Sequence, residues 1–541
     1  MKFKKSVIGF VIIIFIMNIP MEVFSNEILV KAKETHQTMV GFGASIGWYE
    51  NTLTSHPQKE DIYYQIFDNL GLDILRLRNV YRNDPNFAAP FAEIVGKLYE
   101  YSPDIPKVLI SSWSPPYDIK SNNSTSGGSN ATLKKNTTTN KFMYGEFGQY
   151  WVDALGAYRN IGIEPDYISI QNEPSYDASW ESCRFEPTEG TVAGYDKALD
   201  SVYFALQQAG FQTKILAPEC HGIGYNTFQN YAARYNHTKV DGYAYHLYHG
   251  ESDNVSDNHN PDLFNTNLAN IGNNYKSKPI FQTEYDRGSW FNTVWLMHNC
   301  LVNGNVSAYF WWELVWGSGG KPLIEMQSTT FTISKYYWAF RQYSKYISGG
   351  WKRVTASNDT DSLRVSAFIN PDGNSLTVVV INLGSQTKTM NFALQDFSVT
   401  NGEVIRTSET ESGNIVSSSY NGTTSLDFPS RSITTIAFSG TLVTSVNELQ
   451  YSNPSEYSLS QNYPNPFNPS TKIQFTLGKE QFVSLKIYDI LGREISTLVQ
   501  KELPGGIHSV DFDAAKMNSG IYVYRITAGD FTESRKMLLL R

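Results

Sequence analysis

The stretch Tyr167-Ile-Ser-Ile-Gln-Asn-Glu-Pro (residues 167–174) joins a short apolar run to a polar end, a pattern typical of a buried strand followed by a loop. Three more runs of this kind are Asp73-Ile-Leu-Arg-Leu, Lys107-Val-Leu-Ile-Ser and Gly242-Tyr-Ala-Tyr. Longer amphipathic stretches separate them, which predicts βα units around a parallel sheet. About eight such units fit into residues 39–345, so the sequence predicts an α/β fold of the (β/α)8 TIM-barrel type.

The pattern changes after residue 345. Residues 346–440 contain β-rich segments separated by Gly, Asn, Asp and Ser, which predicts a side β-sandwich. We expect the early stretch 26–38 to supply its first strand. A polar linker is expected over residues 441–460, and residues 461–541 are predicted to form a separate C-terminal β-sandwich.

The first 25 residues have the features of a secretory signal peptide: early lysines, an apolar run over residues 7–17, and small residues near the end. We therefore expect a soluble protein exported from the cytoplasm. The net charge of -8 disfavours nucleic acid and anionic membranes as partners and fits a neutral substrate. The three cysteines show no metal-ligand spacing. A Cys183–Cys220 disulfide is conceivable, but reduced, buried thiols are favoured.

Two glutamates stand at the ends of predicted strands, Glu173 in the opening stretch and Glu284 in Pro279-Ile-Phe-Gln-Thr-Glu-Tyr. Hydrolysis of a glycosidic bond needs such a pair: one carboxyl protonates the leaving oxygen, and one carboxylate attacks or activates water. Asn172 precedes the first glutamate, where its amide can reach a sugar hydroxyl. The pair therefore predicts a glycoside hydrolase.

Several motifs in register resemble glycoside hydrolase family 30, and most closely its bacterial xylanase branch. They are Gly41-Phe-Gly-Ala, Ser111-Ser-Trp-Ser-Pro-Pro, Ile168-Ser-Ile-Gln-Asn-Glu-Pro, His246-Leu-Tyr, Thr283-Glu and Ala308-Tyr-Phe-Trp-Trp. The resemblance covers about residues 28–440 and implies a retaining mechanism. It places Glu173 as the acid/base on the fourth barrel strand and Glu284 as the nucleophile on the seventh.

Arg76 matches the arginine on the family's second strand, which would hold Glu284 ionised and oriented. Arg78, two residues later, points to the same side of the strand, so the choice between the two arginines stays open. A structural salt bridge is the alternative role.

Aromatic and polar residues at other strand ends are expected to bind or position the substrate. Trp113 and Trp312 are candidate platforms for sugar rings, while Trp311 is expected to point away and pack against helices. We expect His246 to be a positioning residue and Tyr248 to donate to Glu284. This chemistry requires neither a metal nor an organic cofactor.

The loop after the eighth strand, Glu313-Leu-Val-Trp-Gly-Ser-Gly-Gly-Lys-Pro, differs from that of the glucuronoxylan-specific relatives. Those relatives carry an arginine there, which binds the glucuronate side group. This loop offers Glu313 and Trp316 instead, and its only cation is Lys321. A carboxylate at this position is expected to repel a glucuronate, so dependence on that decoration is not expected.

The C-terminal segment resembles the type A sorting domain of the type IX secretion system. The matching features are Asn462-Tyr-Pro-Asn-Pro-Phe-Asn-Pro, Ile487-Tyr-Asp-Ile-Leu-Gly-Arg, Gly520-Ile-Tyr-Val-Tyr-Arg and Ser534-Arg-Lys-Met-Leu. The resemblance implies that type IX machinery is a partner and that the protein passes through the periplasm to be secreted or attached to the cell surface. A carbohydrate-binding module is the competing interpretation, disfavoured because the segment has no Trp.

Taken together, the sequence predicts a monomeric, secreted, retaining endo-β-1,4-xylanase-type enzyme that acts on plant hemicellulose. Alternatives within the family are a β-1,6-glucanase and an exo-acting β-xylosidase. A catalytically inactive polysaccharide-binding protein is the alternative from another class, but the presence of both carboxylates argues against it.

Overall fold

The computed structural model describes residues 26–102, 107–249, 260–443, 457–462 and 464–540. The chain divides into two compact units, Met1–Val443 and Thr444–Arg541, which are described separately here. The predicted signal peptide and most of the predicted linker lie outside the described residues. Within the described ranges, no helix combines the length and the apolar character that a membrane crossing requires.

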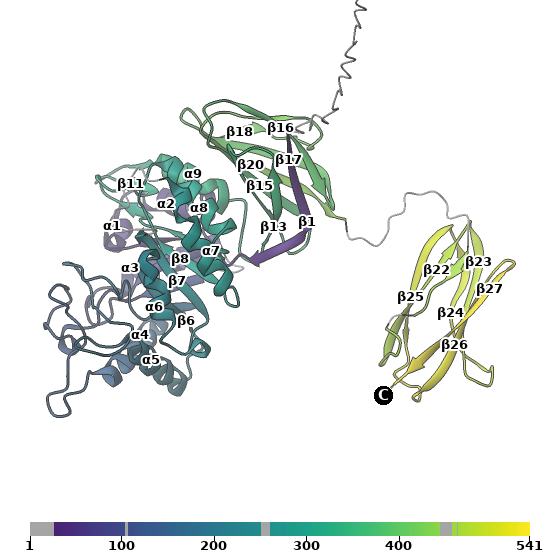
Figure 1. Cartoon of the computed structure of the whole chain (residues 1–541), viewed down its shortest axis with the longest axis horizontal. Helices are drawn as coiled ribbons and strands as arrows, with labels where there is room; N and C mark the ends of the chain where they lie inside the picture. The colour runs from purple at the N-terminus through teal and green to yellow at the C-terminus, as the bar shows by residue number, and fades with distance from the viewer. Residues whose placement is uncertain (1–25, 103–106, 250–259, 444–456, 463, 541) are drawn as a thin grey trace, which may run out of the picture. The chain divides into compact units, whose positions relative to one another are not determined.

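A closed barrel of eight parallel strands lies at the centre of the first unit and confirms the predicted fold class (Figure 1). Its strands, in order around the barrel, are β2 (Gly41–Ile46), β3 (Ile74–Arg78), β4 (Lys107–Ser111), β5 (Tyr167–Ser169), β6 (Lys214–Gly222), β7 (Gly242–His249), β8 (Ile280–Glu284) and β9 (Ala308–Trp311). The fourth and seventh barrel strands are therefore β5 and β8.

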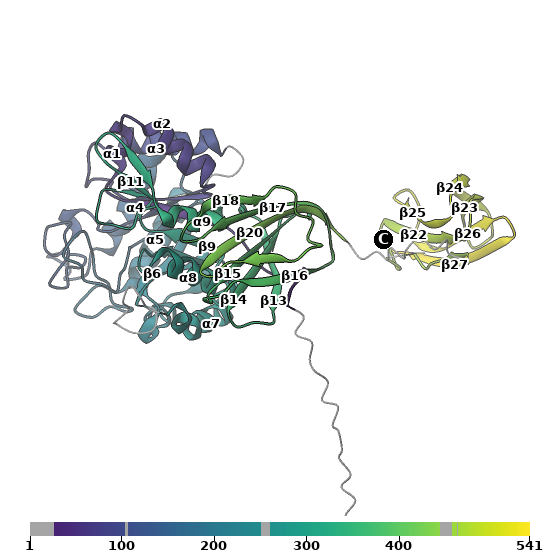
Figure 2. The same cartoon turned by 90° about the horizontal axis from the view of Figure 1, so that it is seen from above.

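Helices surround the barrel and bury its outer face (Figures 1 and 2). They are α1 (Glu50–Ser55), α2 (Lys59–Tyr63), α3 (Ala88–Tyr101), α4 (Tyr144–Asn160), α5 (Tyr195–Ala209), α6 (Thr227–Ala232), α7 (Asn265–Asn274), α8 (Trp290–Val302) and α9 (Lys335–Ser344). A π-helical segment, Tyr64–Asn69, continues α2, and short 3-10 turns cover Tyr117–Ile119, Gly224–Asn226, His237–Lys239 and Pro261–Phe264. A small sheet of β10 (Val315–Trp316), β11 (Ile324–Met326) and β12 (Phe331–Ile333) follows the last barrel strand.

The first barrel strand begins with two glycines that its neighbours require. Gly41 has φ +139°, and a Cβ there would lie 2.4 Å from the Cβ of Asp73. A Cβ on Gly43 would lie 2.4 Å from the ring of Phe310 on β9. Only glycine fits where the side chains of adjacent strands come so close. The barrel therefore closes with Phe310 packed against the backbone of β2.

A nine-stranded sheet forms the side domain, in the order β18-β17-β20-β15-β14-β13-β1-β16-β19. Its strands are β1 (Glu27–Thr38), β13 (Lys352–Asn358), β14 (Leu363–Ile369), β15 (Ser375–Asn382), β16 (Lys388–Gln395), β17 (Phe397–Thr407), β18 (Ser412–Ser417), β19 (Leu426–Phe428) and β20 (Ser432–Leu442). The strand β1 pairs antiparallel with β13 and parallel with β16. The start of the described chain is thus inserted between two strands that follow the barrel in the sequence.

Buried hydrogen bonds join this sheet to α9 of the barrel. Gln342 donates to the Thr407 hydroxyl at 2.9 Å, and its side-chain oxygen accepts from the Thr435 hydroxyl at 2.5 Å. Tyr343, also on α9, is completely buried and lies 3.2 Å from the hydroxyl of Ser366. Because all these polar groups are satisfied, the junction can be buried at little cost and holds the two domains of the first unit together.

The second unit contains two antiparallel sheets around one apolar core. One sheet contains β21 (Ser458–Leu459), β22 (Ser470–Leu477) and β25 (Gly506–Asp513); the other contains β24 (Glu494–Leu503), β23 (Gln481–Tyr488), β26 (Gly520–Ala528) and β27 (Phe531–Leu539). Apolar side chains alternate along β22 and β23, and their inward positions are buried. The core explains why this segment folds as a unit of its own.

Candidate active site

A cavity of about 460 Å³ opens at the C-terminal ends of the barrel strands. Its lining residues are Trp48, Trp113, Glu173, Tyr176, Trp180, His221, Tyr248, Glu284, Asp286, Arg287, Trp312, Glu313 and Trp316. Seven of the ten site residues predicted from the sequence line it. The other three, Arg76, Asn172 and His246, lie directly behind the two glutamates, as the contacts below show. The barrel therefore brings all ten together.

Glu173 follows β5 and has a left-handed backbone with φ +49°, a conformation that non-glycine residues seldom adopt. Its backbone N–H donates to the carbonyl of Glu219 at 3.0 Å, and Glu219 is itself left-handed, with φ +60°. Such strain persists only where the surrounding structure enforces it, and it often marks functional sites. The Glu173 carboxyl is 7% exposed, so it faces the cavity from a nearly dry position.

Glu284 is the last residue of β8 and is held at both carboxylate oxygens. Arg76 donates to Oε2 at 2.7 Å, and the Tyr248 hydroxyl donates to Oε1 at 3.0 Å. The arginine contact is a short, charge-assisted hydrogen bond of the strong class. Glu284 therefore has one fixed orientation.

Arg76 on β3 is completely buried and contacts two carboxylates. Besides Glu284, its Nη2 lies 3.2 Å from Glu219 and donates to the Asn172 side-chain oxygen at 2.6 Å. Burial by itself lowers the pKa of Arg76, but the charges of Glu219 and Glu284 outweigh it and raise that pKa. Burial likewise raises the pKa of Glu219, but the charge of Arg76 and the neighbouring His246 bring it down to about 2. Arg76 and Glu219 are thus charged throughout the physiological range.

The open choice between the two arginines is resolved by these contacts. Arg78 lies farther toward the rim and pairs with Glu50 and Glu181, each at 3.2 Å. Its guanidinium also stacks over the Trp48 ring at 4.6 Å. Arg78 therefore supports the rim, while Arg76 contacts Glu284.

His246 on β7 contacts Glu173 from behind, with its Nδ1 3.0 Å from Oε1. Burial alone would lower the pKa of His246, but the charge of Glu284 and the hydrogen bond to Glu173 raise it to about 9. The ring is therefore protonated at neutral pH and donates to Glu173. Burial, followed by the charge of Glu284, raises the pKa of Glu173 against the effect of His246.

The two carboxyl groups thus have different surroundings. Glu284 accepts from the charged Arg76, whereas burial raises the pKa of Glu173, which favours Glu173 as the proton donor. A Glu173 oxygen, a His246 ring nitrogen and a Glu284 oxygen lie within 4.8 Å of one another. Side chains of these types can bind a metal, and a carboxyl pair this close is also the arrangement that glycoside hydrolysis needs.

Four tryptophans gather beside the glutamates. The Trp48 ring centroid lies 5.7 Å from those of Trp113 and Trp312, and 6.5 Å from that of Trp316. Trp113 also stacks against Arg76 at 4.5 Å, so one of its faces supports the charge network. Trp311 packs against Tyr336 and Phe340, away from the cavity, as expected. An apolar aromatic wall of this kind suits the faces of pyranose rings.

Glu313 requires a correction to the charge argument made from the sequence. It lines the cavity but is only 7% exposed, and burial, with the charges of Asp286 and Glu284, raises its pKa to about 8. At neutral pH it is largely an uncharged carboxylic acid, so repulsion of a glucuronate by its charge was a wrong expectation. Arg287, after β8, lines this cavity, whereas Lys321 is not among its described lining residues.

Several residues in or behind the cavity were not identified from the sequence. Glu219, behind it, carried a usable signal, because it ends the apolar run Ile215-Leu-Ala-Pro just as Glu173 ends its own. Trp48 lies two residues after the end of the barrel strand β2. Tyr176, His221 and Tyr248 form a stack with centroid separations of 4.3 and 5.1 Å, which no local pattern indicates. The three cysteines are free and buried, consistent with the favoured reduced state.

Comparison with known proteins identifies two parts of the chain. Residues 350–436 match the glycosyl hydrolase family 30 beta sandwich domain, and residues 461–539 match the secretion system C-terminal sorting domain. The glucuronoxylanase XynC of Bacillus subtilis is 24% identical over 395 residues, which cover 70% of this chain and 83% of that protein. The endo-1,6-beta-D-glucanase neg1 of Aspergillus fumigatus is 24% identical over 383 residues, covering 65% and 73%.

A solved structure supports the fold. The glycoside hydrolase family 30 subfamily 8 xylanase Xyn30A of Clostridium acetobutylicum aligns with a TM-score of 0.60 at 23% identity and covers 77% of this chain and all of that one. These findings confirm both resemblances stated from the sequence. The side domain matches the family 30 beta sandwich domain, the two curated relatives named above are glycosidases, and the C-terminal unit matches a secretion system sorting domain.

The raised pKa of Glu313 predicts a pH-dependent stability. Its folded pKa of about 8 lies above its unfolded value, so the folded state holds a proton that the unfolded state releases. The stability that Glu313 contributes to the fold is fully present below about pH 4, the pKa of the unfolded state, and is lost as pH rises through 8. In the wild type, the free energy of unfolding should fall by something on the order of 3 kcal/mol as pH rises from 5 to 9 because of this group. Glu313→Gln should remove that loss, so its melting temperature should change less with pH over this range.

Glu325→Gln, on the neighbouring strand β11, is the matched control and should keep the wild-type slope. If the melting temperature of Glu313→Gln changes with pH as steeply as that of the wild type, Glu313 is ionised in the folded protein at neutral pH. Its charge would then repel a glucuronate.

Proposed function

We propose that the chain is a retaining endo-β-1,4-xylanase-type hydrolase that cleaves plant hemicellulose by double displacement. The main support for this mechanism is the distance between a Glu173 oxygen and a Glu284 oxygen, which is within 4.8 Å. Retaining enzymes hold their two carboxyl groups about 5 to 5.5 Å apart, whereas inverting enzymes need a wider gap for a water molecule.

In the first step a Glu284 oxygen attacks the anomeric carbon and forms a glycosyl ester. Glu173 gives its proton to the leaving oxygen as the glycosidic bond breaks. The raised pKa of Glu173 keeps that proton available, and Arg76 and Tyr248 hold the attacking carboxylate in place. Asn172, fixed by Arg76, is positioned to bind a hydroxyl of the reacting sugar.

Formation of the ester removes the negative charge of Glu284. The pKa of Glu173 therefore falls, and its ionised form becomes more stable. In the second step Glu173 takes a proton from water, whose oxygen attacks the anomeric carbon and releases Glu284 as a carboxylate. His246 donates to the Glu173 carboxylate and balances its charge during this step. Neither step needs a metal or an organic cofactor.

The aromatic wall and the sequence relatives support a β-linked polysaccharide as substrate. A xylan-type polymer is favoured by the motif resemblance, and the similarity to an endo-1,6-beta-D-glucanase keeps β-1,6-glucan as the second candidate. The loop over residues 313–322 offers no arginine for a glucuronate. A purely polysaccharide-binding role is disfavoured, because both carboxylates and their partners are present.

The C-terminal unit supports export by the type IX machinery, which would release the enzyme or leave it attached at the cell surface. The sorting-domain match extends over nearly the whole second unit. The catalytic and sorting roles therefore lie in separate compact units.

The acid/base role predicts a substrate-dependent defect in Glu173→Ala. Turnover of xylan should fall at least a thousandfold, while aryl glycosides with very acidic leaving groups should keep measurable turnover because they need little protonation. Azide should accelerate these residual reactions by attacking the glycosyl ester in place of activated water.

Glu284→Gln is the matched comparison and should be inactive on both substrate classes, with or without azide, since an amide cannot form the ester. Equal losses on all substrates without azide rescue in Glu173→Ala would contradict its assignment as acid/base.

The substrate proposal predicts faster hydrolysis of β-1,4-xylan than of β-1,6-glucan, measured as kcat/KM. Plain xylan should be cleaved at least as well as glucuronoxylan, since the eighth-strand loop provides no arginine for the acidic group. Activity on glucuronoxylan alone would refute this, and Arg287→Gln would then show whether the cavity's own cation binds the side group.

The division into two units predicts that residues 26–443 form an active enzyme without the sorting domain. Because the barrel and the side domain lie in one compact unit that ends at Val443, kcat/KM on soluble xylan should stay within about twofold of the full chain. Expressed together with residues 1–25 in a host with the type IX machinery, this fragment should accumulate in the periplasm. Normal export of the fragment would remove the sorting role from the C-terminal unit.

A further inference from the structure

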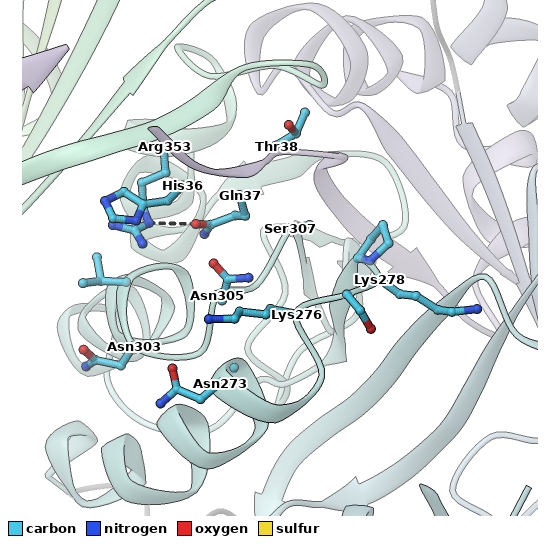
Figure 3. Close-up of a pocket in the computed structure, with 14 residues that line it drawn as sticks. His36, Gln37, Thr38, Asn273, Lys276, Lys278, Asn303, Asn305, Ser307 and Arg353 are labelled. Atoms are coloured by element: carbon cyan, nitrogen blue, oxygen red, sulfur yellow. Dashed lines mark hydrogen bonds between the residues drawn. The ribbon is translucent and has the colours of Figure 1, made fainter. Parts of the chain in front are cut away.

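A second cavity, of about 500 Å³, lies at the opposite end of the barrel from the glutamates (Figure 3). The strands β1 and β13 of the side domain form one wall, and the loops that lead into β8 and β9 form the other. Pro279 lies at the N-terminal end of β8 and Glu284 at its C-terminal end, so about 17 Å of strand separates the two cavities.

The lining of this cavity is cationic and polar. It includes Arg353, Lys276, Lys278 and His36, together with asparagine, glutamine and hydroxyl side chains. None of its fourteen described lining residues is acidic, and none is Phe, Tyr or Trp. Lys278 is already engaged, because its Nζ donates to the backbone carbonyls of His237 and Val240. Arg353 and Lys276 are thus the cations that remain for a ligand.

Arg353 is the strongest sign of a missing partner. It is only 8% exposed, and its Nε donates to the Gln37 side-chain oxygen at 2.9 Å. Gln37 is itself fixed, because its amide donates to the carbonyls of Leu301 and Val306. Within the described part of the chain, no carboxylate forms an ion pair with Arg353. A buried charge without a counter-ion is costly, and an anionic ligand would relieve that cost.

The surroundings of Arg353 show the same surplus of positive charge. Burial and the charge of Arg353 lower the pKa of His36, and burial with nearby arginines, Arg353 among them, lowers that of His298 to about 3. The carboxylates whose charges reach these histidines have other partners. Glu34 pairs with Lys31 at 2.9 Å, and Asp262 pairs with Arg364 at 2.7 Å.

We propose that this cavity binds a small oxyanion, either the carboxylate of a uronic acid or inorganic phosphate, with Arg353 and Lys276 as its charged contacts. Figure 3 shows Arg353, His36 and Gln37 on one side of the cavity, and Asn273, Lys276 and Asn303 across from them. An anion between these groups satisfies the guanidinium and accepts hydrogen bonds from the amides. A neutral sugar fits poorly, because the described lining offers no Phe, Tyr or Trp ring for stacking.

The site does not depend on the proposed hydrolysis, because it is built from other residues at the other end of the barrel. Its two walls belong to the side domain and to the barrel. A bound anion therefore links the two domains and should raise the melting temperature of the first unit.

The test is calorimetric titration of the purified full-length chain with sodium glucuronate, inorganic phosphate and glucose at constant ionic strength. At least one of the two anions should bind with one site per chain, and glucose should not. Binding of glucuronate alone indicates an acidic polysaccharide as the source, and binding of phosphate alone indicates the free ion; either result supports the oxyanion site.

Variants then locate the binding. Arg353→Gln should abolish it, and Lys276→Gln, at an exposed position that cannot affect folding, should weaken it about threefold or more. Lys141→Gln, an exposed lysine in the loop before α4, is the matched control and should bind as the wild type does. The proposal is overturned if neither anion binds the wild type, or if Lys276→Gln and Lys141→Gln bind equally well.

Discussion

The buried guanidinium of Arg76 is the interaction on which the active site depends. It sits inside the barrel with no exposure to water and contacts Glu284, Glu219 and Asn172 at once. Removing such a group would leave two buried carboxylates to share the cation His246, and breaking a buried ion pair costs several kcal/mol in proteins. The same arginine therefore orients the attacking carboxylate and stabilises the barrel interior. The strained backbones of Glu173 and Glu219 are held in place by the same network.

A consequence of this network is that the two glutamates play different parts although both are nearly buried. Glu284 receives donors on both oxygens, one of them a full positive charge. Among the described residues no arginine pairs with Glu173; it accepts from His246, and His221 Nε2 lies 3.7 Å from its Oε1. Two identical side chains thus become an anion and an acid through their neighbours alone.

The sequence predicted the features that depend on local pattern. Alternating apolar runs identified the barrel, and the placement of Glu173 and Glu284 at strand ends identified the pair that meets in the cavity. Arg76 and Arg78 could not be separated, because they lie on the same side of one strand and differ only in distant partners, such as Glu50 in α1. The uncharged state of Glu313 could not be foreseen either, since it results from burial by residues far apart in the chain. Glu219 was missed for another reason. Glycoside hydrolysis needs two carboxyl groups, and nothing in the sequence indicated that a third would pair with Arg76.

The pairing of β1 with β13 sets the order in which the first unit can be completed. Ile28 pairs with Asn358, roughly 330 residues later, and β1 also lies beside β16. Contacts over such sequence distances form late, because a large loop must close first. During synthesis and export the amino-terminal strand appears before any of its partners, and its apolar residues Ile28 and Val30 stay exposed until then. The side sheet can therefore be completed only after β13 and β16 have been made. A chain released before that point would expose the unpaired edge of β1, which could pair with another molecule.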